Sequence, residues 1–236
     1  MTSTEYQKIA TPFKRDPQTN KLIFNAGART QDPSLDSPTV FTDPAIAALQ
    51  YSDDWFFTEK IDGTNIRVIW NGHNVESLGR TDNAQFSKSQ SETLSKLFGG
   101  EDKETLFEQK FGATPAVLYG ELYGAGVQKG GDYRSDLGFI LFDVRVNDLW
   151  LHRDDVEDVA EELGLEIVPI ILGGSGGSED LWGAISVVSE GLRSQIAMKH
   201  SGKSIWAEGL VGTTYSGLLN RRGERVIVKV KHRDFF

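Results

Sequence analysis

Two β-rich runs joined by a lysine-containing turn constrain this chain more than any other feature of its sequence. Residues 55–59 (WFFTE) and 64–70 (TNIRVIW) are rich in aromatic and β-branched residues, which favour strands. Asn71-Gly72 follows the second run directly and is a strong hairpin signal, so residues 74–80 (NVESLGR) are expected to return as a third strand. The pattern therefore places Lys60 between two strands.

The rest of the chain mixes helical and extended patterns. Apolar residues at helical spacing after a serine-rich start predict a connecting helix over residues 91–111, and similar patterns predict helices at 44–49, 153–165 and 179–192. Apolar runs predict strands at 116–123, 138–146, 204–212 and 225–231, and GGSGG at 173–177 predicts a flexible loop. Because the elements do not alternate in strict βαβ order, we expect one α+β domain over residues 1–236, with residues 1–50 as an N-terminal wrapping segment.

The charge balance limits the partners of this protein. Its 236 residues carry 25 basic and 34 acidic side chains, a formal net charge of −9. This balance argues against broad electrostatic adhesion to nucleic acid or to acidic membranes, so any polyanion site must be local. Basic residues do cluster near the C-terminus, where they form either the solvated faces of a strand or part of such a site (Arg221, Arg222, Arg225, Lys229, Lys231, His232 and Arg233).

The chain contains no cysteine, which excludes disulfides, thiolate metal sites and a cysteine nucleophile. Its first residues lack a basic-then-apolar signal pattern, and no run approaches the roughly 18 apolar residues of a membrane helix. We therefore expect a cytoplasmic protein with no membrane partner.

Lys60 is the first candidate for chemistry. A free lysine amine, with a pKa near 10.4, is almost entirely protonated at pH 7, so a nucleophilic lysine needs burial or a cationic neighbour. A lone KxDG sequence also occurs by chance, as a solvated lysine before an ordinary Asp-Gly turn. The residues 59–65 (EKIDGTN) leave both interpretations open.

The order of the remaining motifs separates these interpretations. KIDGTN resembles motif I of the covalent nucleotidyltransferases, the superfamily of ATP-dependent ligases and capping enzymes, and five more stretches resemble the later motifs in the same order: GRT (79–81), YGELYG (119–124), FILFDV (139–144), AEGLV (207–211) and VKVK (228–231). Together they span about three-quarters of the chain. Asn65 stands where DNA ligases and capping enzymes usually have arginine, and the continuation is similar to the RNA ligase 2-like branch of ATP-dependent RNA ligases.

This resemblance implies an adenylyltransferase domain of antiparallel sheets with flanking helices around a nucleotide cleft, and a reaction through a lysine–AMP intermediate. It implies that Lys60 attacks ATP and that Lys229 and Lys231, two apart on one strand face, contact the AMP phosphate. The other implied roles are Glu59 at the purine edge, Asn65 at the reacting phosphate, Arg80 at a phosphate, Glu121 at the ribose, Phe142 stacked on adenine, and Asp62 and Glu208 around Mg²⁺ or Mn²⁺.

The resemblance implies RNA ends with a 5′-phosphate and a 3′-hydroxyl as partners. Only five residues follow Lys231, so we expect neither an oligonucleotide-binding barrel nor a helical domain after it, and an accessory protein for RNA capture becomes an option. Two alternatives stay open: the core of a DNA ligase or capping enzyme, and a non-catalytic nucleotide-binding protein. An edge strand protected by lysines is the alternative interpretation of Lys229 and Lys231, and the order of the motifs disfavours it.

Overall fold

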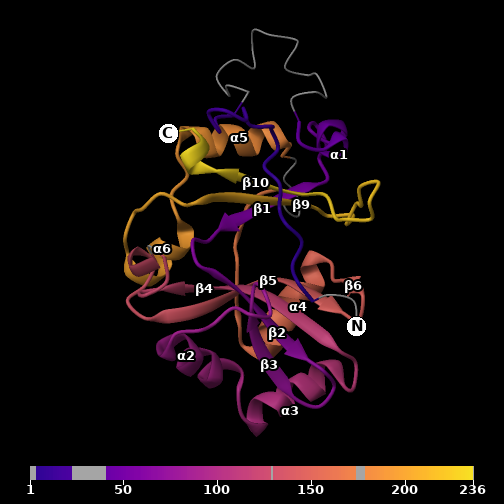
Figure 1. The fold of residues 1–236 in the computed structure, drawn as a ribbon, viewed down its shortest axis with the longest axis vertical. Helices are drawn as coiled ribbons and strands as arrows, with labels where there is room; N and C mark the ends of the chain where they lie inside the picture. Colours follow the sequence, from indigo (N-terminus) through magenta and orange to yellow (C-terminus); the bar gives the residue numbers. More distant parts are fainter. Residues whose placement is uncertain (1–3, 23–40, 129, 174–178, 236) are drawn as a thin grey trace. The chain divides into compact units, whose positions relative to one another are not determined.

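The computed structural model describes residues 4–22, 41–128, 130–173 and 179–235. Its contacts divide the chain into two compact units, whose elements are drawn in Figure 1. Unit 1 comprises Met1–Tyr6, Asp62–Val168 and Ile196–Lys203, and unit 2 comprises Gln7–Ile61, Pro169–Gln195 and Ser204–Phe236. The expectation of a single domain over 1–236 stays a prediction.

A six-stranded sheet forms the centre of unit 1. Its strands are β2 Thr64–Trp70, β3 Val75–Gly79, β4 Ala116–Gly124, β5 Leu137–Val146, β6 Leu149–Trp150 and β7 Glu166–Ile167. The order β3-β2-β4-β5-β6 is antiparallel throughout, and β7 lies parallel beside β5. The Asn71-Gly72 hairpin joins β2 to β3 as predicted, with Gly72 at a φ of +97°. The predicted α+β class with antiparallel sheets is confirmed.

The two faces of this sheet have different characters, because successive side chains of a strand point to opposite sides. Ile66 and Val68 of β2 and Leu118 of β4 are fully buried on the core face, which is packed by α2 Lys88–Phe98, α3 Glu101–Phe111 and α4 Arg153–Leu163. The alternate positions of β2 and β4 carry Asn65, Arg67, Tyr119 and Glu121. This second face therefore holds two of the residues predicted for the site.

The helices of unit 1 depart from the sequence prediction at one glycine pair. The single helix predicted over 91–111 is wrong: α2 ends before Gly99 and α3 begins after Gly100, which has a φ of +96° that ordinary residues rarely adopt. The serine-rich start does cap α2, because Ser87 and Gln90 form a reciprocal capping box. α4 ends at Gly164 in the left-handed conformation, as its sequence predicts.

Unit 2 is built on a four-stranded antiparallel sheet in the order β10-β9-β1-β8. Its elements are α1 Pro44–Ala48, β1 Trp55–Lys60, β8 Ile170–Leu172, α5 Leu181–Glu190, β9 Gly209–Thr214, β10 Ile227–Lys231 and the 3₁₀ turn η5 His232–Asp234. Its core contains several large aromatic side chains, among them Phe13, Phe41, Trp55 and Trp182. None of the helices in the described ranges combines the length and apolar composition that crossing a membrane requires.

One prediction for this part of the chain was wrong, and one helix was missed. The strand expected at 204–212 begins only at Gly209, and residues before it contribute an isolated bridge between Trp206 and Arg193. The helix α6, Gln195–Ser201, was not predicted at all. Apart from Gly173, the predicted GGSGG loop lies outside the described residues.

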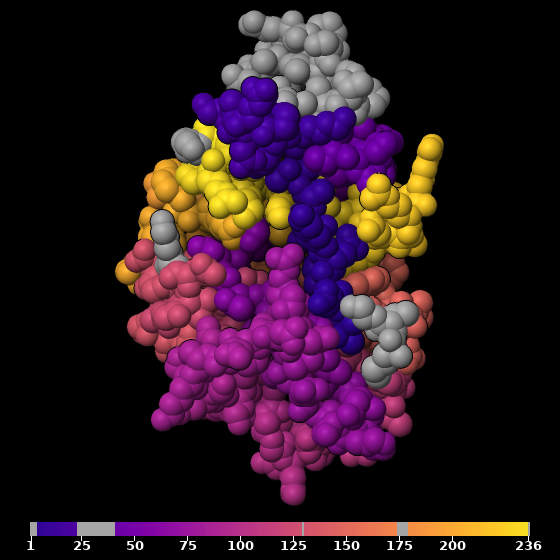
Figure 2. All heavy atoms as spheres, viewed as in Figure 1, coloured from indigo at the N-terminus to yellow at the C-terminus, as the bar shows by residue number. Residues whose placement is uncertain are grey.

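The N-terminal segment of unit 2, residues 7–22, runs along the outer edge of β10. Ala10 forms a parallel bridge with Val228, and the Lys229 N–H donates to the Ala10 carbonyl at 2.9 Å. Figure 2 shows this segment in indigo beside the yellow C-terminal residues. The edge of β10 is thereby covered, which removes the need for lysines to protect it.

Candidate active site

Lys60 and Lys231 share one carboxylate in unit 2. The Lys60 Nζ lies 2.5 Å from Oε2 of Glu208, and the Lys231 Nζ lies 2.7 Å from Oε1 of the same side chain. Only 13–21% of each of the three side chains is exposed. The structure thus brings together three of the predicted site residues, contributed by β1, by β10 and by the residue before β9.

The sheet register explains this arrangement. β9 lies between β1 and β10, and its first residue, Gly209, is paired with Lys60 on one side and with Lys231 on the other. Gly209 has a φ of +147°, and a Cβ there would lie 2.0 Å from the carbonyl oxygen of Val230. Only glycine fits this position, so the glycine after Glu208 allows the two lysine strands to flank the carboxylate closely.

The two lysines control the charge of Glu208. Burial by itself would raise the pKa of this carboxyl group, but the charge of Lys60 and hydrogen bonds from Lys231 and Lys60 outweigh burial, and the pKa is lowered. Glu208 is therefore a carboxylate at neutral pH and a weak proton acceptor. The three groups form a charged cluster with one negative and two positive members.

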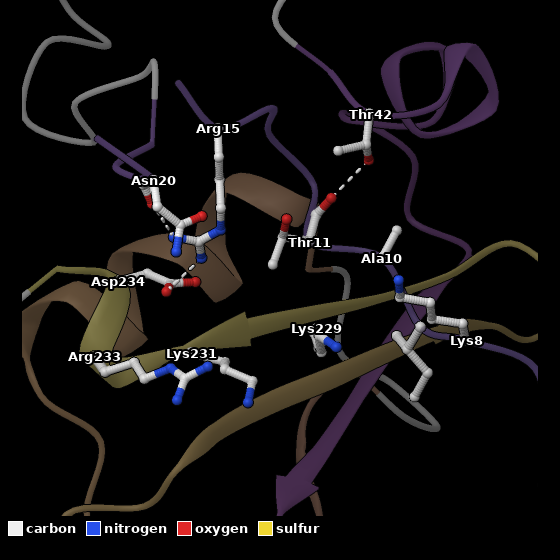
Figure 3. A pocket seen from close by; sticks show the side chains of 11 residues that line it. Lys8, Ala10, Thr11, Arg15, Asn20, Thr42, Lys229, Lys231, Arg233 and Asp234 are labelled. Carbon is white, nitrogen blue, oxygen red and sulfur yellow. Dashed lines mark hydrogen bonds and ion pairs between the residues drawn. The ribbon is translucent and has the colours of Figure 1, made fainter. Parts of the chain in front are cut away.

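Lys229 lies two residues before Lys231 on β10, on the same face of the strand. Both side chains line the same pocket of unit 2 (Figure 3). The predicted juxtaposition of the two late lysines is therefore present.

Glu59 is directed away from solvent and is only 2% exposed. Its carboxylate accepts a hydrogen bond from Ser194 Oγ at 2.5 Å and from the backbone N–H of Gln195 at 2.9 Å. These bonds tie the end of β1 to the start of α6 and the residue before it, so they help to hold the neighbouring Lys60 in place. The role of Glu59 at the purine edge stays a prediction.

A stacked group of three side chains is connected to the backbone of Glu208. The Arg193 guanidinium lies 3.4 Å from the ring centroid of Trp206, and the His232 ring stacks on the same indole with centroids 5.2 Å apart. The backbone N–H of His232 also donates to the backbone carbonyl of Glu208 at 2.9 Å. The sequence offered no signal for this group beyond the aromatic residue in an otherwise polar stretch.

Asn65 and Glu121 are cross-strand partners on the second face of the sheet of unit 1. The Oδ1 atom of Asn65 is buried and has no hydrogen-bond partner among the described residues. An acceptor left unpaired in this way costs free energy, which is commonly recovered when a ligand or water supplies a donor. A Cβ on Gly63 would lie 2.7 Å from Cγ of Glu121, so this glycine of the KIDG turn lets the backbone approach Glu121.

Phe142 occupies an irregularity of the sheet. Tyr119 pairs with Asp143 and Gly120 pairs with Leu141, so Phe142 is the extra residue of a β-bulge. Its ring is half-buried and meets the Tyr6 ring edge-on at 5.2 Å, while the Tyr6 hydroxyl donates to Asp143 at 2.7 Å. Tyr6 was not predicted as a site residue, and it orients the ring that the resemblance assigns to adenine.

Arg67 is a second residue that sequence reasoning left without a role. It is fully buried and donates to the Gly79 carbonyl, to Thr4 Oγ1 and to Asp82 at 2.7–2.8 Å. Gly79 and Asp82 flank the exposed Arg80, so Arg67 holds both ends of the turn that carries Arg80. An arginine inside an apolar strand was the available signal, because buried arginine is rare unless it is paired.

The predicted metal ligands belong to different units, Asp62 to unit 1 and Glu208 to unit 2. Within the described residues, no group of three or more His, Cys, Asp or Glu side chains could hold a metal ion. Mg²⁺ usually keeps several waters and uses one or two carboxylates together with substrate phosphates, so it does not need such a group. The roles of Asp62 and Glu208 around a metal ion stay predictions.

The RNA ligase family model matches residues 53–231. No curated protein matches the chain. Solved structures do match, although their identity to this chain is low, so they bear on the fold alone.

Three of these structures are forms of an RNA ligase from Naegleria gruberi. The form with PPi has a TM-score of 0.57 at 16% identity, covering 78% of this chain and 53% of that one. A mutant with ATP and Mn has a TM-score of 0.56 at 16% identity, covering 80% and 52%. Another mutant with ATP and Mn has a TM-score of 0.57 at 16% identity, covering 96% and 63%. The chain spans about half the length of the first of these ligases. With the family match extending from two residues before β1 to the last residue of β10, this chain belongs to the RNA ligase family.

Proposed function

We propose that this protein is an ATP-dependent RNA ligase that joins RNA 5′-phosphate and 3′-hydroxyl ends through a covalent lysine–AMP intermediate on Lys60. The observation that carries the proposal is the pairing of Lys60 and Lys231 with one carboxylate in a chain of the RNA ligase family. Two amines that contact the two oxygens of one carboxylate can also hold one phosphate group between them. One amine would act as the nucleophile and the other would neutralise charge.

In the first step, the neutral Lys60 Nζ attacks the α-phosphorus of ATP. The N–P bond forms, the bond from the α-phosphorus to the bridging oxygen breaks, and pyrophosphate leaves with the bonding electron pair. Lys60 must first leave its ion pair with Glu208 and lose a proton. Since the pKa of Glu208 is lowered, this carboxylate is a poor acceptor for that proton, and solvent is the better one.

Lys231 and Lys229 then neutralise the charge that develops on the α-phosphate. Both lysines lie on a strand whose edge is bridged by the N-terminal segment. Charges fixed in advance in this way suit electrostatic stabilisation of a transition state. Charge stabilisation and in-line positioning supply most of the catalysis of phosphoryl transfer.

The residues of unit 1 would hold the nucleoside and the reacting phosphates. The unpaired Oδ1 of Asn65 supports a role beside the reacting phosphate, as the acceptor of a hydrogen bond from a phosphate-bound water or another donor. Its cross-strand neighbour Glu121 supports a role as the acceptor of hydrogen bonds from the ribose hydroxyls. The bulge at Phe142 supports a ring presented for stacking, and Arg80 on its anchored turn suits a forked contact with phosphate. Asp62 and Glu208 would hold the hydration shell of Mg²⁺ or Mn²⁺. When bound, the metal supplies positive charge to the phosphate oxygens.

In the later steps, the AMP passes to the RNA 5′-phosphate, and the 3′-hydroxyl of a second end displaces it. We propose RNA repair as the setting, with an accessory protein for RNA capture as a further partner, since a net charge of −9 disfavours tight binding to RNA. The expected cytoplasmic location stays a prediction.

Incubation with α-labelled ATP and magnesium tests the proposal. We expect a labelled covalent adduct in the wild-type protein and none in Lys60→Ala, while the exposed Lys21→Ala serves as a matched control and should label fully. Equal labelling of Lys60→Ala would refute the assignment of the nucleophile. Parallel reactions with GTP, and sealing of nicked DNA against RNA ends, separate an RNA ligase from a capping enzyme or DNA ligase. Binding of ATP without pyrophosphate release would identify a nucleotide sensor.

A further inference from the structure

An exposed tryptophan lies on unit 2, next to the charged cluster of the site. Trp206 comes two residues before Glu208 in the sequence, and 44% of its surface is exposed. An indole left in water forgoes the stabilisation that burial of its large apolar surface would give. Exposed tryptophans are enriched where proteins bind other molecules, because the ring offers both an apolar face and a polar edge. The exposure of Trp206 therefore indicates a binding role.

The guanidinium of Arg193 lies flat on this indole. Its central carbon is 3.4 Å from the ring centroid, which is van der Waals contact, and a perpendicular guanidinium would drive one of its nitrogens into the ring. Within the described residues, the guanidinium donates to the Ser204 carbonyl at 3.0 Å and pairs with no carboxylate. Arg193 is exposed, so the face of its guanidinium that is turned away from Trp206 can accept another planar group.

The backbone holds the two partners of this stack together. Arg193 and Trp206 form an isolated antiparallel bridge, and backbone hydrogen bonds of 2.9 and 3.0 Å extend the pairing to the neighbours of both residues. Gly191, at a φ of +105°, leaves room for the indole, because a Cβ there would lie 2.5 Å from Cζ3 of Trp206. The stack is thus formed in advance, and a ligand would bind it at a small cost in conformational entropy.

The stack is also connected to the proposed nucleophile. His232 stacks on the same indole, and its backbone N–H donates to the Glu208 carbonyl at 2.9 Å. The carboxylate of Glu208 in turn contacts the amines of Lys60 and Lys231. Because Trp206 and Glu208 are two residues apart, their Cα atoms are separated by at most about 7 Å. A nucleotide that stacks at this place would therefore stand close to the amine that carries the adenylyl group.

We infer that the stack of Arg193 on Trp206 is a platform for the terminal nucleobase of an RNA end. The inference rests on the proposed function and names the part of the substrate that this surface recognises. Single-stranded RNA is bound by stacking its bases on aromatic rings and on arginine guanidinium planes. Stacking needs no broad positive surface, so it suits a chain of net charge −9. Every base has a π face, so the platform should accept all four bases.

A thermodynamic cycle between Arg193 and the terminal base tests this inference on the full chain. Short single-stranded RNAs with a 5′-phosphate and a 3′-hydroxyl are titrated without ATP at low salt, either intact or with an abasic nucleotide at the 5′ or the 3′ end. We expect loss of the base at one end to weaken wild-type binding about tenfold, or about 1.4 kcal/mol, within the range of base stacking. The same loss should cost less than about twofold in Arg193→Ala.

Two further variants separate stacking from charge. Arg193→Lys keeps the positive charge but lacks the guanidinium plane, so its binding should also be insensitive to loss of the base. Arg222→Ala is the matched control, because Arg222 is an exposed arginine of unit 2 outside the stack, and it should keep the full effect of the base.

The inference is wrong if loss of the base at either end leaves wild-type binding unchanged, or costs as much in Arg193→Ala as in the wild type. It also fails if Arg193→Lys keeps the full effect of the base, since the contact is then one of charge. Weaker binding of AMP in Arg193→Ala, with the effect of the RNA base intact, would assign the stack to adenine instead. RNA binding is measured without adduct formation, so loss of the base effect in the Arg193 variants supports the inference even in a protein that forms no adduct, whereas a missing adduct refutes only the proposed function.

Discussion

Replacing Glu208 by Gln should separate the electrostatic role of this residue from its shape. Glutamine keeps the size of the side chain but cannot neutralise Lys60 and Lys231, so two ammonium groups would face one uncharged amide. Breaking a fully buried ion pair costs about 3–5 kcal/mol. Because 13–21% of each side chain is exposed, solvent screening reduces this, and we expect a loss of about 2–3 kcal/mol in the free energy of unfolding near pH 7.

The pH dependence of this loss has a definite sign. The pKa of Glu208 is lowered in the folded protein, so its stabilising contribution is complete above its unfolded pKa, near 4.3, and disappears as the pH falls through the folded value. Below that value the wild-type side chain is protonated and as neutral as glutamine. The stability difference between the wild type and Glu208→Gln should therefore shrink towards zero on acidification.

Differential scanning calorimetry at several pH values can measure this difference. For a chain of this size, about 2–3 kcal/mol corresponds to a fall of roughly 5–10 °C in Tm near neutral pH. Glu92→Gln is the matched control, because Glu92 is 67% exposed and lies 3.8 Å from Lys88, and it should change Tm by less than about 2 °C. A difference that is absent near pH 7, or that persists unchanged in acid, would refute this account of the charged cluster.

Two further substitutions test the structural support of the site. Gly209→Ala should cost about 3 kcal/mol in the free energy of unfolding and abolish adduct formation, because its Cβ would meet the Val230 carbonyl at a φ of +147°. The control Gly217→Ala, at a φ of +65° with open space around it, should cost about 1 kcal/mol. Chemical denaturation and labelling with ATP measure both effects, and full labelling of Gly209→Ala would contradict the packing argument. Arg67→Met should cost about 3 kcal/mol, since it removes three hydrogen bonds, of which the one to the Gly79 carbonyl is buried, whereas Asp82→Ala should cost less than about 1 kcal/mol because Asp82 is 75% exposed. Equal losses in these two variants, measured by the same denaturation curves, would show that the buried contacts of Arg67 contribute nothing.

Much of the local structure of this protein could be predicted from its sequence. The runs before and after Lys60 are strands, Asn71-Gly72 is the hairpin turn, and Gly164 ends its helix in the left-handed conformation. Lys229 and Lys231 lie on one strand face, as their spacing of two requires. These features depend on side-chain periodicity and on the backbone preferences of single residues, which act over a few positions.

The tertiary structure alone decided which distant residues meet. Lys60 and Glu208 are 148 positions apart in the sequence, and they meet because β9 is inserted between β1 and β10 with Gly209 opposite both lysines. No local signal encodes that register, which is selected by the packing of the whole sheet and by the clearance available at a glycine. The bulge at Phe142 and the basic pocket closed by Lys8 and Arg15 arise in the same way, from pairing between segments that the sequence keeps far apart.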